Sequence, residues 1–105
     1  MLRDEMLLPA TKAISTKIIT SLSSSTQEFF DPLAEYIEIN AINQAILCHL
    51  GATASATNNG FDWCVLPGQT KVFRISQDMR GNDKYVALIE QAAGATAIVN
   101  QYQRN

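Results

Sequence analysis

The sequence has few charged residues, one histidine and only two cysteines in 105 residues. Charged residues make up 17% of the chain, against about 25% in a typical soluble domain. The eight basic residues form no patch and the net charge is -2, which argues against nucleic acid as a partner. No apolar run approaches the roughly 20 residues of a membrane span, and the first residues lack the pattern of a signal peptide. We therefore expect a protein made and retained in the cytoplasm, with no membrane partner.

The two cysteines, Cys48 and Cys64, fall in segments with strand-like patterns. In a cytosolic protein such residues are more often buried thiols than a disulfide. They form no CxxC motif and no cluster with histidine, which argues against a zinc site. The only histidine, His49, follows Cys48 directly. Because neighbouring residues of a strand point to opposite faces, the sequence argues against a catalytic Cys–His pair.

The segment from Asp78 to Asp83 could offer oxygen ligands to calcium. Its spacing does not match an EF-hand loop, and Arg80 within it opposes cation binding, so we expect a solvated turn. The sequence shows no nucleophile with an orienting base, no metal cluster and no phosphate loop. We therefore expect no enzymatic activity, no cofactor and no metal.

The sequence does contain repeated alternation of polar and apolar residues between turn signals, which is typical of half-buried strands. In residues 12–22 the spacing of Ile14, Ile18 and Leu22 would suit a helix, but the many β-branched side chains favour a strand. Gln27–Phe30 indicates a further short strand. The length fits one domain. These patterns predict an all-β fold, a small antiparallel β-sandwich of jelly-roll type over residues 12–105. The alternating segments are Tyr36–Asn40, Ala45–Leu50, Phe61–Leu66, Lys71–Ser76, Tyr85–Glu90 and Ala95–Tyr102.

The pairing of these strands is predicted from the turns between them. Asp31-Pro32 could open a helix that runs to Gly51, or could form a turn before a hairpin. The period-two pattern around Ile37 and Ile39 favours the hairpin, with its turn at residues 41–44. Pro67-Gly68 is a type II turn signal. We expect a last hairpin from residues 84–91 and 95–103, closed at Ala93-Gly94.

Two regions are candidates for contact with partners. Residues 1–11 are expected to form an N-terminal extended arm, which could dock on a neighbouring subunit or cover the domain's own core. Aromatic residues dominate interface hot spots, so Phe61 and Trp63 become partner contacts if they share an exposed face. The candidate contact residues are Leu2, Met6, Leu7, Leu8, Phe61 and Trp63.

The C-terminal segment from Ala92 to Gln103 has no charged residue. An apolar, uncharged hairpin tends to aggregate unless it is buried in its domain or in an oligomer. We therefore expect a homo-oligomer or a subunit bound in a larger lattice.

Four stretches, taken in order, resemble a widespread type of small phage virion protein. That type has an extended segment, a G-x-T-A-T loop, an L-P-A/P-G turn and a final A-x-G-x-A-x-V hairpin. The resemblance covers residues 34–102, and the chain departs from the pattern in residues 1–33 and at Trp63-Cys64, where a short aliphatic residue is usual. The matching stretches are Tyr36–Ile39, Leu50–Thr57, Leu66–Thr70 and Ala92–Val99.

The resemblance implies a β-sandwich that assembles on a capsid or tail, as decoration and cement proteins do, with no catalytic residues to carry over. On this reading the chain is a non-enzymatic structural protein of a bacteriophage virion, in particular a capsid decoration subunit. Its partners would be copies of itself and a major capsid or other virion protein. The alternative is a carbohydrate-binding or fibre-type sandwich module, which predicts a row of exposed aromatic residues. Fold alone does not separate these two functions.

Overall fold

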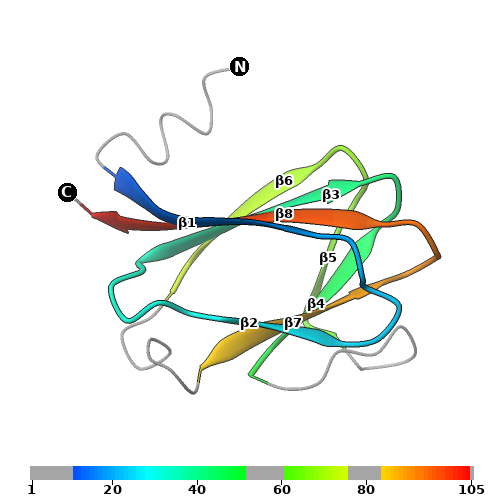
Figure 1. Ribbon diagram of the computed structural model, residues 1–105, viewed down its shortest axis with the longest axis horizontal. Coiled ribbons are helices and arrows are strands. Elements are labelled where there is room, and N and C mark those ends of the chain that lie inside the picture. The colour runs from blue at the N-terminus through cyan, green and yellow to red at the C-terminus, as the bar shows by residue number, and fades with distance from the viewer. Residues whose placement is uncertain (1–10, 52–60, 76–83, 105) are drawn as a thin grey trace.

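The computed structural model describes residues 11–51, 61–75 and 84–104, which build two antiparallel four-stranded sheets packed face to face (Figure 1). We call them the β8 sheet, with strand order β1-β8-β3-β6, and the β7 sheet, with order β2-β7-β4-β5. The fold is thus all-β, as the alternating pattern predicted. The strands are β1 (Thr11–Ile19), β2 (Thr26–Phe29), β3 (Tyr36–Ile42), β4 (Ile46–Leu50), β5 (Trp63–Val65), β6 (Thr70–Arg74), β7 (Tyr85–Glu90) and β8 (Thr96–Arg104).

The chain crosses between the two sheets at almost every connection. Among the eight strands described, β4 and β5 are the one consecutive pair joined by hydrogen bonds. This strand order is that of a jelly roll, in which two sheets are wound from one folded-over ribbon. The first strand begins at Thr11, which pairs with Arg104, so the predicted boundary between arm and domain lies one residue inside β1. Residues 1–10 of the arm, with its four candidate contact residues, lie outside the described residues.

The two predicted hairpins are wrong, although their strands exist. Strand β3 pairs with β6 and β8, whereas β4 pairs with β5 and β7, so the turn at Asn43 carries the chain across the core. The turn before β8 does the same, since β7 and β8 lie in different sheets. Asn43 and Gly94 both have positive φ, of 74° and 99°, which lets the backbone reverse sharply at these crossings. The helix considered for residues 31–51 is likewise absent, since β3 and β4 occupy this segment.

The turn at Pro67-Gly68 is confirmed. The amide of Gln69 donates to the carbonyl oxygen of Leu66 at 2.9 Å, and Gly68 has a φ of 80°, as the third residue of a type II turn requires. The side chain of Gln69 also accepts a hydrogen bond from the amide of Leu66. The turn joins β5 in the β7 sheet to β6 in the β8 sheet. Its two hydrogen bonds restrict the conformation of the backbone at this connection.

The hydrophobic core lies between the sheets, where the inward side chains of every second residue meet. In β3, for example, Ile37, Ile39 and Ala41 are buried while the residues between them are half-buried. Burial of each isoleucine side chain contributes about 1.5–3 kcal/mol to folding. The largest fully buried apolar side chains are Leu22, Ile39, Ile46, Leu47, Val65, Val86, Leu88 and Val99.

The uncharged C-terminal segment has a place inside the domain. Strand β8 is hydrogen-bonded on one side to β1 and on the other to β3, so both of its backbone edges are paired. Its composition is therefore explained without an oligomer, because an interior strand needs no charges to protect it. The C-terminal segment therefore no longer supports the predicted homo-oligomer, and that prediction depends on other surfaces of the molecule. The described part of the chain holds no helix with the length and apolarity of a membrane span.

Candidate interaction surface

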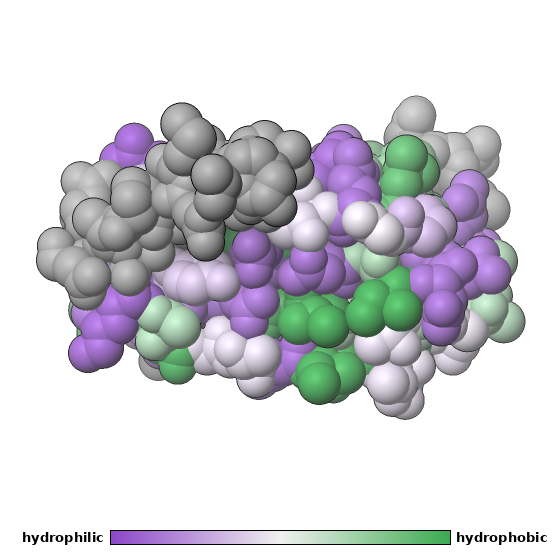
Figure 2. Space-filling view, turned by 90° about the horizontal axis from the view of Figure 1, so that it is seen from above, coloured by the Kyte–Doolittle hydropathy of each residue, from purple (hydrophilic) through white to green (hydrophobic). Residues whose placement is uncertain are grey.

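The outer face of the β8 sheet carries a small apolar patch, formed by Ile18, Ile42 and Ile98 and here called the isoleucine patch. Ile18 on β1 pairs directly with Ile98 on β8, and Ile42 lies on β3, next to β8. Ile18 is 68% exposed and Ile42 is 38% exposed. Figure 2 looks onto this face and shows hydrophobic side chains gathered near its centre with hydrophilic ones around them. An outward sheet face is usually polar, so the patch needs an explanation.

Polar side chains held by hydrogen bonds border the isoleucine patch. Glu38 accepts hydrogen bonds at one carboxylate oxygen from Asn100, at 2.8 Å, and from the hydroxyl of Tyr102, at 3.0 Å. The hydroxyl of Thr70 donates to the side chain of Asn40. An apolar centre with a polar rim is the usual composition of a protein–protein interface. The rim is already ordered, so a partner would need to fix few side chains on binding.

The two aromatic residues singled out in the sequence lie away from this patch. Trp63 is half-buried, packs against Phe73 with ring centroids 4.3 Å apart, and contacts the core. Phe61 is also half-buried, just before β5. Their role as partner contacts stays a prediction. The sequence held one sign of the isoleucine patch. Ile18 and Ile98 stand at the alternate positions of β1 and β8 that face outward, where a polar residue is usual.

Cys48 and Cys64 are both free thiols, as expected. Cys48 is buried in the core, and its pKa is raised from 9.0 to about 12, first by burial and then by the nearby Cys64. The unfolded thiol would ionise near 9, so this residue favours the folded state less as the pH rises from about 9 toward 12. His49 faces the other side of the sheet, 3.8 Å from a carboxylate oxygen of Asp62.

We expect an aromatic disulfide reagent at pH 8 to modify Cys64 in the native protein and Cys48 only after unfolding. The thiolate is the reactive form, and a buried thiol with a pKa of about 12 supplies almost none of it. Absorbance of the released thiol measures the rate. The Cys64→Ser variant should react slowly, and the matched Cys48→Ser variant should keep the faster phase. Equal rates for the two variants would show that Cys48 is accessible.

A cluster of polar side chains lies between the sheets, where β1 faces β2. Gln101 on β8 is 2% exposed and Glu28 on β2 is 3% exposed. The Gln101 amide nitrogen donates to Glu28, at 3.3 Å, and to the carbonyl oxygen of Phe29, at 2.9 Å. Its oxygen accepts from the backbone amide of Asp31 at 2.8 Å, and Lys17 lies 3.4 Å from Glu28. The cluster therefore fastens the crossing from β2 to β3 onto the opposite sheet.

The sequence did not predict this cluster. Its signal is Gln101 at the inward position that follows Ala95, Ala97 and Val99, where another apolar residue would be expected. In the part of the chain that the structure describes, no three His, Cys, Asp or Glu side chains lie where they could hold a metal together. The acidic segment at residues 78–83 lies outside that part.

Comparison with known proteins adds to the fold and not to the function. No family model and no curated protein matches the chain. Among solved structures it is similar to the solution NMR structure of a de novo designed double-stranded β-helix, at 12% sequence identity and a TM-score of 0.51. The match covers 86% of this chain and 100% of the designed one. At this identity the likeness supports the jelly-roll architecture alone.

Proposed function

We propose that this protein is a non-enzymatic structural component of a bacteriophage virion, a capsid decoration or cement subunit that acts through protein–protein contacts. The observation that carries the proposal is the exposed isoleucine patch on the outer face of the β8 sheet, bordered by ordered polar side chains. The jelly roll supports it by analogy, since this architecture recurs in viral capsid proteins, although lectins and cupins share it. The stretches that resemble small virion proteins give the particular class.

The occupant that we assign to the isoleucine patch is a second copy of this chain. Ile18 lies on β1, which is an edge strand of the β8 sheet, so the patch reaches the border of the molecule. A two-fold contact places the same patch on both subunits, and an apolar centre is complementary to itself. The β1 edge itself is protected against strand pairing by Lys12, by Lys17 and by the irregularity between Ala13 and Ser15. Face packing therefore fits this sheet better than extension at its edge.

We expect the Ile18→Lys variant to weaken self-association at least tenfold, because a buried ammonium at the centre of an interface would lose its hydration without a partner. The matched control is Leu33→Lys, since Leu33 is 64% exposed but lies in the loop between β2 and β3. Sedimentation velocity over a range of concentrations measures the association. An equal loss in both variants, or in neither, would remove the patch as the contact.

The virion assignment has its own test. Mass spectrometry of purified particles of the phage that encodes this chain should detect it at a stoichiometry comparable to a capsid protein. If the chain is present in infected cells and absent from washed particles, it is not a virion component. Binding to a glycan array would instead support the carbohydrate-binding alternative.

A further inference from the structure

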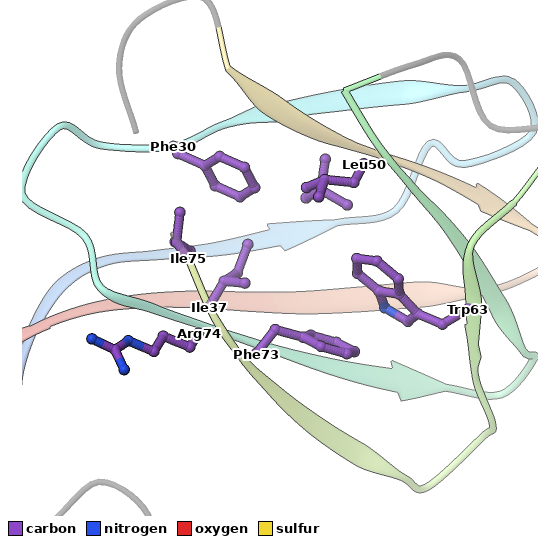
Figure 3. Close-up of a pocket in the computed structure, with 8 residues that line it drawn as sticks. Phe30, Ile37, Leu50, Trp63, Phe73, Arg74 and Ile75 are labelled. Atoms are coloured by element: carbon purple, nitrogen blue, oxygen red, sulfur yellow. The ribbon is translucent and has the colours of Figure 1, made fainter. Parts of the chain in front are cut away.

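A small apolar cavity lies between the two sheets, about 160 Å³ in volume (Figure 3). Its walls come from both sheets and from residues at the ends of their strands. An engineered apolar cavity of about 150 Å³ stays dry and binds benzene. The volume and walls therefore suit one small apolar molecule. The apolar side chains that line the cavity are Phe30, Ile37, Leu50, Trp63, Phe73, Ile75 and Val86.

Backbone hydrogen bonds hold the walls of this cavity in place. Most of the lining residues lie on strands and are fixed by sheet pairing. Two others follow the last residue of a strand. The amide of Phe30 donates to the carbonyl oxygen of Lys84 at 2.9 Å, and the amide of Ile75 donates to that of Glu35 at 2.7 Å. Because fixed surroundings relax only in part, the space does not close readily, and a ligand would meet a site that is already formed.

Neither polar side-chain group of the lining is placed to bind a ligand inside the cavity. Nε1 of Trp63 is fully buried and has no surface that a ligand could reach. Arg74 also lines the cavity, but it is an exposed residue, and Figure 3 shows its guanidinium directed away from Trp63 and Phe73. A polar atom of a ligand would thus lose its hydration and gain no hydrogen bond to these side chains in return. The lining therefore favours a hydrocarbon over a molecule of the same shape that carries a polar atom.

We propose that this cavity is a binding site for a neutral hydrocarbon group of about the size of benzene. Binding removes the apolar surface of the ligand from water and gives the wall atoms dispersion contacts that they otherwise lack. Leu50, at the end of β4, is 38% exposed, so the cavity reaches the molecular surface at this point and offers a path of entry. The site lies between the sheets and is independent of the isoleucine patch on the outer face.

The test is an NMR titration of the full chain with two probes of the same shape, benzene and pyridine, at a pH where pyridine is uncharged. We expect benzene to shift the methyl resonances of Ile37 and Ile75 saturably. Pyridine should bind at least about fivefold more weakly, because its ring nitrogen loses hydration in the cavity. The methyl resonances of Ile18 report any binding to the isoleucine patch in the same titration. No saturable shift at Ile37 and Ile75 would overturn the site, and equal or tighter binding of pyridine would overturn its preference for hydrocarbons.

Two matched variants locate the binding in the cavity. Val86→Leu adds one carbon to a lining residue, whereas Val99→Leu makes the same change at a buried core position outside the lining. We expect Val86→Leu to weaken benzene binding by about threefold or more, and Val99→Leu to change it by less than about twofold. The amide resonances report whether each variant is folded, and the comparison of benzene with pyridine in the unaltered protein depends on neither. An equal effect of the two changes would contradict the assignment of the site.

Discussion

Replacing Gln101 by leucine is expected to lower the free energy of unfolding by about 2–5 kcal/mol. The leucine is of similar size, so the loss comes from hydrogen bonds and not from a cavity. The change leaves the carbonyl oxygen of Phe29, the amide of Asp31 and the carboxylate of Glu28 each short of a partner. Each buried group that loses its partner costs about 1–3 kcal/mol, and a charged group costs more. Urea unfolding followed by circular dichroism measures the difference.

A second variant tests whether the effect belongs to the cluster. In the double variant with Glu28→Leu and Gln101→Leu the buried carboxylate is absent, so the combined loss should be smaller than the sum of the single losses. The matched control is Gln103→Leu, on the same strand but only half-buried, which should change stability by less than about 1 kcal/mol. Strict additivity of the two changes would show that Glu28 and Gln101 do not act together.

The Leu88→Ala variant should lose about 2–5 kcal/mol of unfolding free energy. Leu88 is fully buried on β7, an interior strand of its sheet, and packs within the core cluster. The loss combines the transfer of the removed carbons with the cavity that they leave, and a core between two rigid sheets closes such a cavity poorly. Chemical denaturation at one pH measures it.

The control for this change is Leu33→Ala, at an exposed position, which should alter stability by less than about 0.5 kcal/mol. If the two substitutions lowered the free energy of unfolding equally, β7 would not be an interior strand of the core. Because Leu33→Ala and Leu88→Ala remove the same atoms, their difference isolates the effect of burial.

The positions of the strands could be predicted from the sequence, because alternation is a local property of each segment. Tyr85–Glu90 agrees with the predicted strand at both ends, and the turn at Gly68 follows from the conformational freedom of glycine. Strand partners could not be predicted in this way. Whether the turn at Asn43 or Gly94 joins strands of one sheet or crosses between sheets depends on contacts far along the chain, such as β1 with β8.

The site residues show the same limit. Trp63 could be recognised as a large aromatic residue in a strand, but the neighbours that enclose it, Phe73 and Ile37, come from other strands. Ile18 and Ile98 are 80 positions apart in sequence and become one patch only through the register of β1 on β8. From the sequence, a homo-oligomer was predicted because the C-terminal segment has no charged residue. In the structure that segment is an interior strand, so the proposal of a homo-oligomer rests on the isoleucine patch of the β8 sheet.

The central claim, that this jelly roll functions by assembling with copies of itself, is tested most directly by its native mass. Light scattering should be measured on the full chain and on a form that begins at Thr11. The account predicts a defined multiple of 11.5 kDa for the full chain, and the same number of subunits for the shorter form, which keeps the isoleucine patch. A monomer mass for both forms at every accessible concentration, which is 11.5 kDa for the full chain and correspondingly less for the shorter one, would contradict it.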